Sequence, residues 1–304
     1  MIKPKPISDI KQVKKTIEEL QAIDIEKETI ENLQNYFNQI MHGYSVIAMA
    51  LNPGFVLYRG IKYTERPKKI VEIIYPPKNK AKINRASNEG EQMFYASASK
   101  KPVFYELNAQ PGDKFIISTW KTNNVLLFNN IGYTKSNFEE LGASRLPLDF
   151  LKPNDDVTNK FIADFLAKCF CQNISRENTY LYKLTIAIAR IHLQNVYDKR
   201  FAGLFYPTVQ LNADEENFAI NKSVIDNGLL DFERIEFVEV IDKIQNQFKY
   251  RILDIAYEIK NGNIEWKNLE TQWTLYDDSE ELFFVEENER VIAYDRDGNI
   301  IDCD

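Results

Sequence analysis

The sequence is poor in the residues that build metal centres and covalent cross-links. Its 304 residues include only three cysteines and two histidines. Cys169, Cys171 and Cys303 form no Cys-x-x-Cys pair. We therefore expect neither a zinc site nor a disulfide framework, and the natural setting of such a chain is a reducing cytoplasm.

The chain also lacks an excess of positive charge. Acidic residues number 45 against 38 lysines and arginines, which gives a net charge of −7. A field of this sign repels a phosphate backbone. We therefore expect no nucleic-acid partner.

Long hydrophobic runs are absent as well. The best apolar run, residues 44–51, ends at Asn52-Pro53 and is far shorter than the about 20 residues that span a bilayer. The opening MIKPKPISD has no apolar segment of the kind found in signal peptides. These features predict no membrane partner and a cytoplasmic protein, and 44% apolar with 27% charged residues is typical of an ordinary globular chain.

Apolar periodicity divides the chain into regions of different character. Residues 8–43 predict two amphipathic helices with Ser8 and Asp24 as N-caps. Helical spacing returns at 157–171 and 177–197. Short segments rich in β-branched and aromatic residues predict strands at 55–58, 70–75, 92–96, 103–107, 114–119, 125–128, 204–209, 218–220, 237–241 and 250–257.

This order of elements predicts an α+β protein. We expect a helical extension at 1–45, a central domain at 46–235 and a β-rich C-terminal extension at 236–304. The sequence Asp295 to Asn299 resembles the start of a calcium loop, but the chain ends before the acidic twelfth position, so a hairpin turn is the expected structure there.

Four segments of the central region carry unusual groups of polar and aromatic residues. They are Tyr58-Arg59-Gly60, Asn84 to Gly90, Met93 to Ser97 leading to Tyr105-Glu106, and Gly203 to Val209. Tyr95 precedes Glu106 by eleven residues, and Arg85 precedes both. In combination these segments resemble the RES-domain family, which is named for an arginine, a glutamate and a serine. Asn84 stands where many relatives have glycine, and Thr208 replaces the usual serine.

The resemblance covers about residues 50–235 and implies both a fold and an activity. The fold would be a mixed sheet core like that of ADP-ribosyltransferases. The activity would be cleavage of the bond between nicotinamide and ribose in NAD, by a glycohydrolase or a phosphorylase, with NAD as substrate and no metal. Relatives act as bacterial toxins that pair with an Xre-like antitoxin protein, which is therefore the expected partner.

The residue types suit this chemistry. Cleavage passes through an oxocarbenium-like ribose, which a carboxylate such as Glu106 stabilises or orients. Arg59 and Arg85 suit a diphosphate, because guanidinium donates two parallel hydrogen bonds and stays charged. Tyr95, and second Tyr58, offer rings that stack on the cationic nicotinamide.

Two residues complete the predicted site. Thr208 is expected to contact the ribose or the carboxamide through its hydroxyl, as the family serine does, although its methyl group crowds a small site. Asn217 supports the neighbouring loop or contacts the ligand. The predicted catalytic set is thus Arg59, Glu106 and Thr208, and the predicted NAD-binding set is Tyr58, Arg85, Tyr95 and Asn217.

Two other functions remain open from the sequence. The first is a transferase that moves ADP-ribose onto a protein. The second is a non-catalytic nucleotide-binding or interaction module, in which Thr208 marks a site that has lost activity. His192 lies near the apolar stripe of its helix, and Cys169 and Cys171 lie in apolar surroundings, so all three are expected to be structural.

Overall fold

The computed structural model describes residues 7–148, 156–194, 200–270, 272–277, 283–287, 290–294 and 300. These residues form a mixed α+β protein in which strands pair mostly antiparallel. The chain divides into two compact units. Unit 1 comprises Met1–Phe55, Tyr75–Ala98 and Thr122–Leu230, and unit 2 comprises Val56–Ile74, Ser99–Lys121 and Asp231–Asp304.

This division differs from the three consecutive segments predicted at 1–45, 46–235 and 236–304. The difference arises because strands that are distant in sequence pair with each other. Strand β2 (Val56–Lys62) pairs antiparallel with β4 (Lys114–Thr122), and β4 is followed in the sheet by β8 (Leu230–Ile244). Each unit is therefore assembled from three separate stretches of chain.

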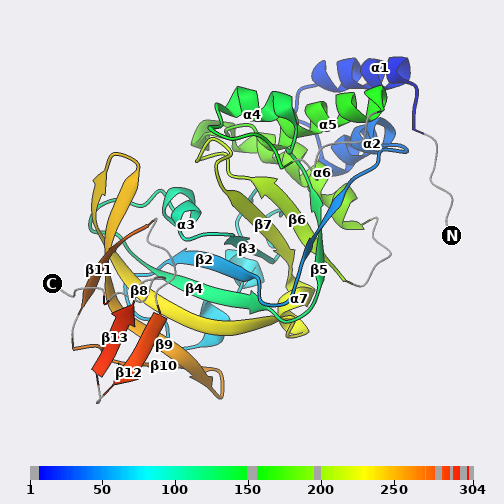
Figure 1. Ribbon diagram of the computed structural model, residues 1–304. Helices are drawn as coiled ribbons and strands as arrows, with labels where there is room; N and C mark the ends of the chain where they lie inside the picture. The colour runs from blue at the N-terminus through cyan, green and yellow to red at the C-terminus, as the bar shows by residue number, and fades with distance from the viewer. Residues whose placement is uncertain are drawn as a thin grey trace. The chain divides into compact units, whose positions relative to one another are not determined.

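Unit 1 contains one part of the sheet, with the strand order β1-β5-β6-β7-β3 (Figure 1). Its strands are β1 (Ala48–Leu51), β3 (Met93–Ser97), β5 (Leu126–Asn130), β6 (Phe201–Pro207) and β7 (Glu216–Asn221). Only β5 and β6 pair in parallel among these neighbours. The strands predicted near 92–96, 125–128, 204–209 and 218–220 are thereby confirmed.

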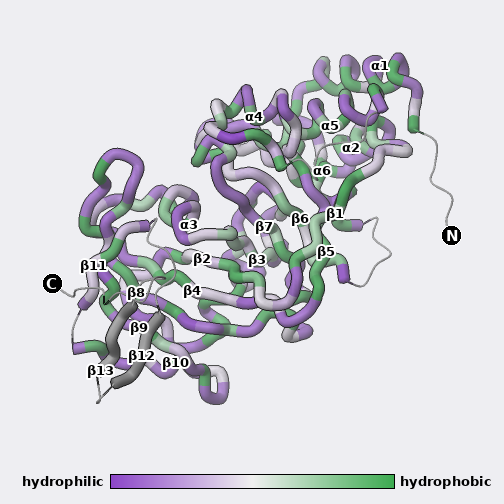
Figure 2. Tube along the Cα trace, viewed as in Figure 1, coloured by the Kyte–Doolittle hydropathy of each residue, from purple (hydrophilic) through white to green (hydrophobic). Residues whose placement is uncertain are grey.

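The helices of unit 1 gather in one group (Figure 1), except for the short α7 (Lys222–Asp226), which contacts β3 and β7. The group comprises α1 (Ile10–Gln21), α2 (Ile30–Ile40), α4 (Lys135–Leu141), α5 (Val157–Phe170) and α6 (Tyr182–Gln194). Figure 2 shows apolar and polar residues alternating along α1, as an amphipathic helix requires. The stripe on α2 is fully buried at Leu33, Phe37 and Ile40, and α2 contacts both α1 and α6. The predicted N-terminal helices exist, and they dock on unit 1.

The predicted N-caps of these helices are wrong. Asp9 caps α1, because its Oδ1 accepts a hydrogen bond from Lys11 N at 2.8 Å. Thr29 caps α2 through Oγ1. The Asp24 side chain instead accepts from Glu26 N within the connection between the helices.

Unit 2 contains the strand order β2-β4-β8-β9-β10, and β11 pairs with the other part of β9. The remaining bounds are β9 (Gln247–Lys260), β10 (Asn263–Trp266), β11 (Trp273–Tyr276), β12 (Phe283–Glu287) and β13 (Arg290–Tyr294). The strands predicted at 55–58, 114–119, 237–241 and 250–257 are confirmed. The predicted turn at 295–299 lies outside the described residues.

Two predicted strands are wrong. Residues 103–107 belong largely to helix α3 (Lys101–Glu106), in which Pro102 sits in the first turn where its missing N–H costs nothing. Residues 70–75 contain a 3-10 turn, η1 (Ile70–Glu72), because the Glu72 side chain accepts the N–H groups of the preceding residues. Tertiary packing in α3 and side-chain capping in η1 override β-type composition. Further 3-10 turns are η2 (Lys78–Lys80) and η4 (Arg176–Leu181).

Candidate functional site

The residues predicted for the site are distributed over both units. Those in unit 2 are Tyr58, Arg59 and Glu106, and those in unit 1 are Arg85, Tyr95, Thr208 and Asn217.

Tyr58 and Arg59 are consecutive on β2 and project from opposite faces of the strand. Arg59 is 8% exposed, and its Nε donates a hydrogen bond to Ile73 O at 3.2 Å. Tyr58 packs in an apolar cluster that includes Phe104 of α3. The guanidinium is thus fixed in part by the backbone, while the tyrosine ring is on the side of α3.

Glu106 is the last residue of α3 and is exposed. The helix crosses β2 at Gly60, where an added Cβ would lie 2.1 Å from Val103 Cγ1. Because Tyr58 and Gly60 share one face of β2, α3 and its glutamate belong to the face that carries Tyr58 and not to the face that carries Arg59. Unit 2 therefore brings the Glu106 helix together with Tyr58.

A buried ionic cluster in unit 2 was not foreseen from the sequence. Glu236 on β8 is 0% exposed and accepts hydrogen bonds from Lys100 Nζ at 2.9 and 3.0 Å and from Arg234 Nε at 2.9 Å. Burial acts to raise the pKa of Glu236, but the charges of Lys100 and Arg234 lower it below its ordinary value. The only signal in the sequence is charge alternating with apolar residues, which is equally typical of a solvent-facing strand edge.

In unit 1 the Arg85 side chain caps the C-terminus of α5. Its Nη1 donates to the Phe170 carbonyl and to Gln172 O at 3.3 Å, and the guanidinium lies over the Phe170 ring with 5.9 Å to the centroid. A cation at this end of a helix satisfies carbonyls that have no helical partner and interacts favourably with the helix dipole. Among the described residues, only Nη1 of this guanidinium has hydrogen-bond partners.

Tyr95 fixes the turn that carries Arg85. The Tyr95 hydroxyl accepts from Ala86 N at 3.1 Å and lies 2.9 Å from Ser87 Oγ. The turn closes on itself through Asn84 N and Ser87 O at 2.9 Å. Burial raises the pKa of Tyr95 to about 12. The structure thus brings Tyr95 and the Arg85 turn together.

Thr208 directly follows β6 and is 0% exposed. Its Oγ1 donates to Glu215 O at 3.1 Å and accepts from Glu215 N at 3.2 Å, so the hydroxyl closes the loop between β6 and β7. Asn217, on β7, is buried and lies opposite Tyr206 and Ser97 in the sheet register. A contact between Thr208 and ribose would require this loop to open, and it stays a prediction.

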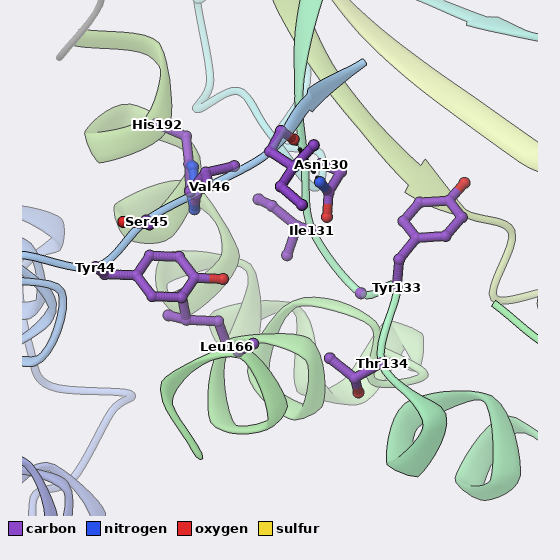
Figure 3. A pocket seen from close by; sticks show the side chains of 12 residues that line it. Tyr44, Ser45, Val46, Asn130, Ile131, Tyr133, Thr134, Leu166 and His192 are labelled. Carbon is purple, nitrogen blue, oxygen red and sulfur yellow. Dashed lines mark hydrogen bonds between the residues drawn. The ribbon is translucent and has the colours of Figure 1, made fainter. Parts of the chain in front are cut away.

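A small cavity in unit 1 lies beside His192 (Figure 3). Its volume of about 10 Å³ holds roughly one water molecule. His192 is 4% exposed, its Nε2 has no hydrogen-bond partner among the described residues, and its ring meets the Tyr44 ring edge-on with centroids 6.5 Å apart. Burial lowers the pKa of His192 to about 4. The cavity is too small for a nucleotide.

A larger cavity of about 440 Å³ lies among α1, α4 and α5. Its volume falls within the range of small-molecule sites, and its lining includes Phe161, Phe165 and Asp164. None of the residues predicted for the site lines either of these two cavities.

Within the described ranges, no group of three or more His, Cys, Asp or Glu residues is arranged to hold a metal ion. No described helix has the length and apolar character needed to cross a membrane. Neither a family model, nor a curated protein, nor a solved structure matches this chain. The resemblance to the RES-domain family therefore stays a prediction that rests on the motifs quoted above.

Proposed function

We propose that this protein is an enzyme that cleaves the nicotinamide–ribose bond of NAD, with Glu106 as the carboxylate that acts on the ribose. The observation that carries the proposal is the setting of Glu106, an exposed carboxylate at the end of a helix that is seated against β2 at Gly60. Catalytic groups act best when rigid elements hold them. A fold like that of ADP-ribosyltransferases is part of the same proposal.

The proposed reaction needs no redox step. The bond between ribose C1′ and the nicotinamide nitrogen breaks heterolytically, and nicotinamide leaves as a neutral molecule with the bonding electron pair. The ribose becomes oxocarbenium-like, and Glu106 stabilises it or orients its hydroxyls. Water or phosphate then forms the new bond to C1′ and, in the case of water, a proton is released.

The other predicted residues would bind the substrate. Tyr58 lies on the same face of β2 as α3, but its ring is buried in the cluster with Phe104, so contact with the nicotinamide would require that cluster to open. Arg85, predicted for the diphosphate, would bind it through Nη2 and Nε, because Nη1 contacts Phe170 O and Gln172 O. Arg59, predicted for the same role, projects from the face of β2 opposite α3 and Glu106. By resemblance, the biological role would be that of a bacterial toxin or defence effector that depletes NAD and is neutralised by an Xre-like antitoxin.

The test is incubation of the purified protein with NAD, with and without phosphate, while nicotinamide and ADP-ribose products are separated by chromatography. Glu106→Gln removes the charge at nearly constant shape, and Glu65→Gln, an exposed glutamate of the same unit, is the matched control. Release that Glu106→Gln abolishes and Glu65→Gln leaves intact supports the proposal. Dependence on phosphate identifies phosphorolysis. ADP-ribose attached to protein, without free ADP-ribose, identifies a transferase. No release of nicotinamide at any enzyme concentration rejects the proposal.

A non-catalytic nucleotide-binding or interaction module is the second candidate. This candidate is favoured because two of the predicted site residues have structural roles. The Thr208 hydroxyl closes the loop at Glu215, and Arg85 caps α5. Such a module predicts heat of NAD binding in calorimetry without nicotinamide release.

A further inference from the structure

Helix α3, which carries Glu106, cannot hold its own position. It has six residues, and its N-cap, Lys100, makes no side-chain capping hydrogen bond. Isolated helices shorter than about 12 residues are marginal in water. The position of Glu106 is therefore determined by whatever holds α3 in place.

The start of α3 is attached to strand β8. Lys100 is buried, and its ammonium group donates to both carboxylate oxygens of Glu236 at 2.9 and 3.0 Å. Arg234 donates to the same carboxylate from the strand itself. Buried charges are retained only when they are paired with good geometry, so this pair fixes the N-cap residue of the helix closely.

The end of α3 is attached to the tip of the hairpin formed by β8 and β9. The Tyr105 hydroxyl donates to Asn246 O at 2.8 Å. Lys243 Nζ lies 5.0 Å from the centroid of the Tyr105 ring, and the Phe248 ring meets that ring edge-on with centroids 5.3 Å apart. The residue next to Glu106 is thus held by the turn and flanks of this hairpin.

We infer that the β8–β9 hairpin is a positioning element for Glu106, attached to α3 by the Lys100–Glu236 ion pair and the Tyr105–Asn246 hydrogen bond. Its catalytic part rests on the proposed function. Glu236 and Asn246 lie after the region of about 50–235 that resembles the RES-domain family, so the inference also assigns a role to the C-terminal strands. Lys100 and Glu236 act through Glu106 and are positioning residues.

The charges of Lys100, Arg234 and Glu236 decide which variant tests the positioning role of the hairpin. Glu236→Gln would leave Lys100 and Arg234 buried without a counter-charge and would threaten folding. Lys100→Met keeps the apolar stem and leaves Glu236 paired with Arg234. Tyr105→Phe removes only the hydroxyl at the other attachment point. Lys121→Met is the matched control, because Lys121 pairs with Glu233 on β8 at a partly exposed site away from α3.

The experiment measures three properties of each variant: hydrogen–deuterium exchange of the backbone at 101–108, the thermal unfolding midpoint, and kcat and KM for nicotinamide release. We expect Lys100→Met to speed exchange at 101–108 and to lower kcat about tenfold or more with KM changed less than twofold, because displacement of a reacting group by about 1 Å is costly. Tyr105→Phe should show the same pattern to a smaller extent. Lys121→Met should leave exchange and kcat unchanged.

The outcomes separate this inference from the proposed function. An active wild type whose kcat is unchanged in both Lys100→Met and Tyr105→Phe overturns the positioning role, whatever the exchange shows. A fall in kcat in Lys121→Met equal to that in Lys100→Met also overturns it, since the effect would then be general. If the wild type releases no nicotinamide, the proposed function fails, and hydrogen–deuterium exchange alone tests whether the hairpin holds α3. Faster exchange at 101–108 in Lys100→Met and Tyr105→Phe than in the wild type supports this role of the hairpin, and unchanged exchange overturns it.

Discussion

The buried histidine of unit 1 gives the chain a defined response to acid. His192 is 4% exposed, its ring is flanked by Tyr44, and its Nε2 has no hydrogen-bond partner among the described residues (Figure 3). Burial lowers the pKa of His192 from 6.5 to about 4. The folded state therefore holds the imidazole neutral, whereas the unfolded chain binds a proton as the pH falls below about 6.5.

The size of the effect follows from linkage. Because the folded pKa is below the unfolded one, the unfolded state binds more protons between these two values, and the free energy of unfolding falls as the pH falls from about 6.5 towards 4. At pH 5 the loss relative to pH 8 is about 2 kcal/mol from this group alone. That is a sizeable part of the about 5–15 kcal/mol that stabilises a typical domain.

Urea unfolding followed by tryptophan fluorescence at pH 8 and pH 5 measures the loss. His192→Leu removes the titrating group, so its stability should fall by about 2 kcal/mol less than that of the wild type between these pH values. His42→Gln, at an exposed histidine, controls for the replacement of a histidine as such. Equal losses of stability in the wild type and His192→Leu would refute a neutral, buried imidazole.

Three further predictions concern buried and half-buried groups of unit 1. Thr208→Val should lower the free energy of unfolding by about 1–3 kcal/mol, because Glu215 N loses the Thr208 hydroxyl, whereas Glu215 O keeps the backbone N–H of Thr208 at 2.8 Å. Thr208→Ser should restore most of this stability in thermal unfolding. Arg85→Met should lower the free energy of unfolding in urea by about 1–3 kcal/mol, because carbonyls at the end of α5 lose their donor. An unchanged free energy of unfolding would show that this cap is unimportant. Burial raises the thiol pKa of Cys169 to about 12 and that of Cys171 to about 11, so peptide mapping after thiol labelling at pH 8 should find both unlabelled in the native state and labelled in urea.

The sequence was sufficient to predict those elements whose own pattern of apolar residues determines their secondary structure. The stripe of apolar residues on α2 recurs at helical spacing, and the structure buries Leu33, Phe37 and Ile40 completely. Helix α3 could not be found this way, because Val103, Phe104 and Tyr105 have β-type composition. The contacts that make this segment a helix come from β2 and from the β8–β9 hairpin, far away in the sequence.

The same limit applies to the candidate site. Sequence identifies residue types and their order, but not their partners. Nothing near Arg85 indicates that Phe170 O will accept its hydrogen bond, and nothing near Lys100 indicates that Glu236 lies beside it. Buried polar side chains find partners wherever the fold brings them, so a motif alone does not separate a ligand-binding arginine from a helix cap.

The central claim is that Glu106 acts on the ribose of NAD, and a single-turnover experiment tests it most directly. With enzyme in excess over NAD, each enzyme molecule reacts at most once. The rate of nicotinamide release then does not depend on how fast the products leave the enzyme. The account predicts release by the wild type and a rate at least about 100-fold lower in Glu106→Gln, in the range expected when a transition-state stabilising group is lost. Equal rates in the two proteins, or no release by the wild type, would contradict it.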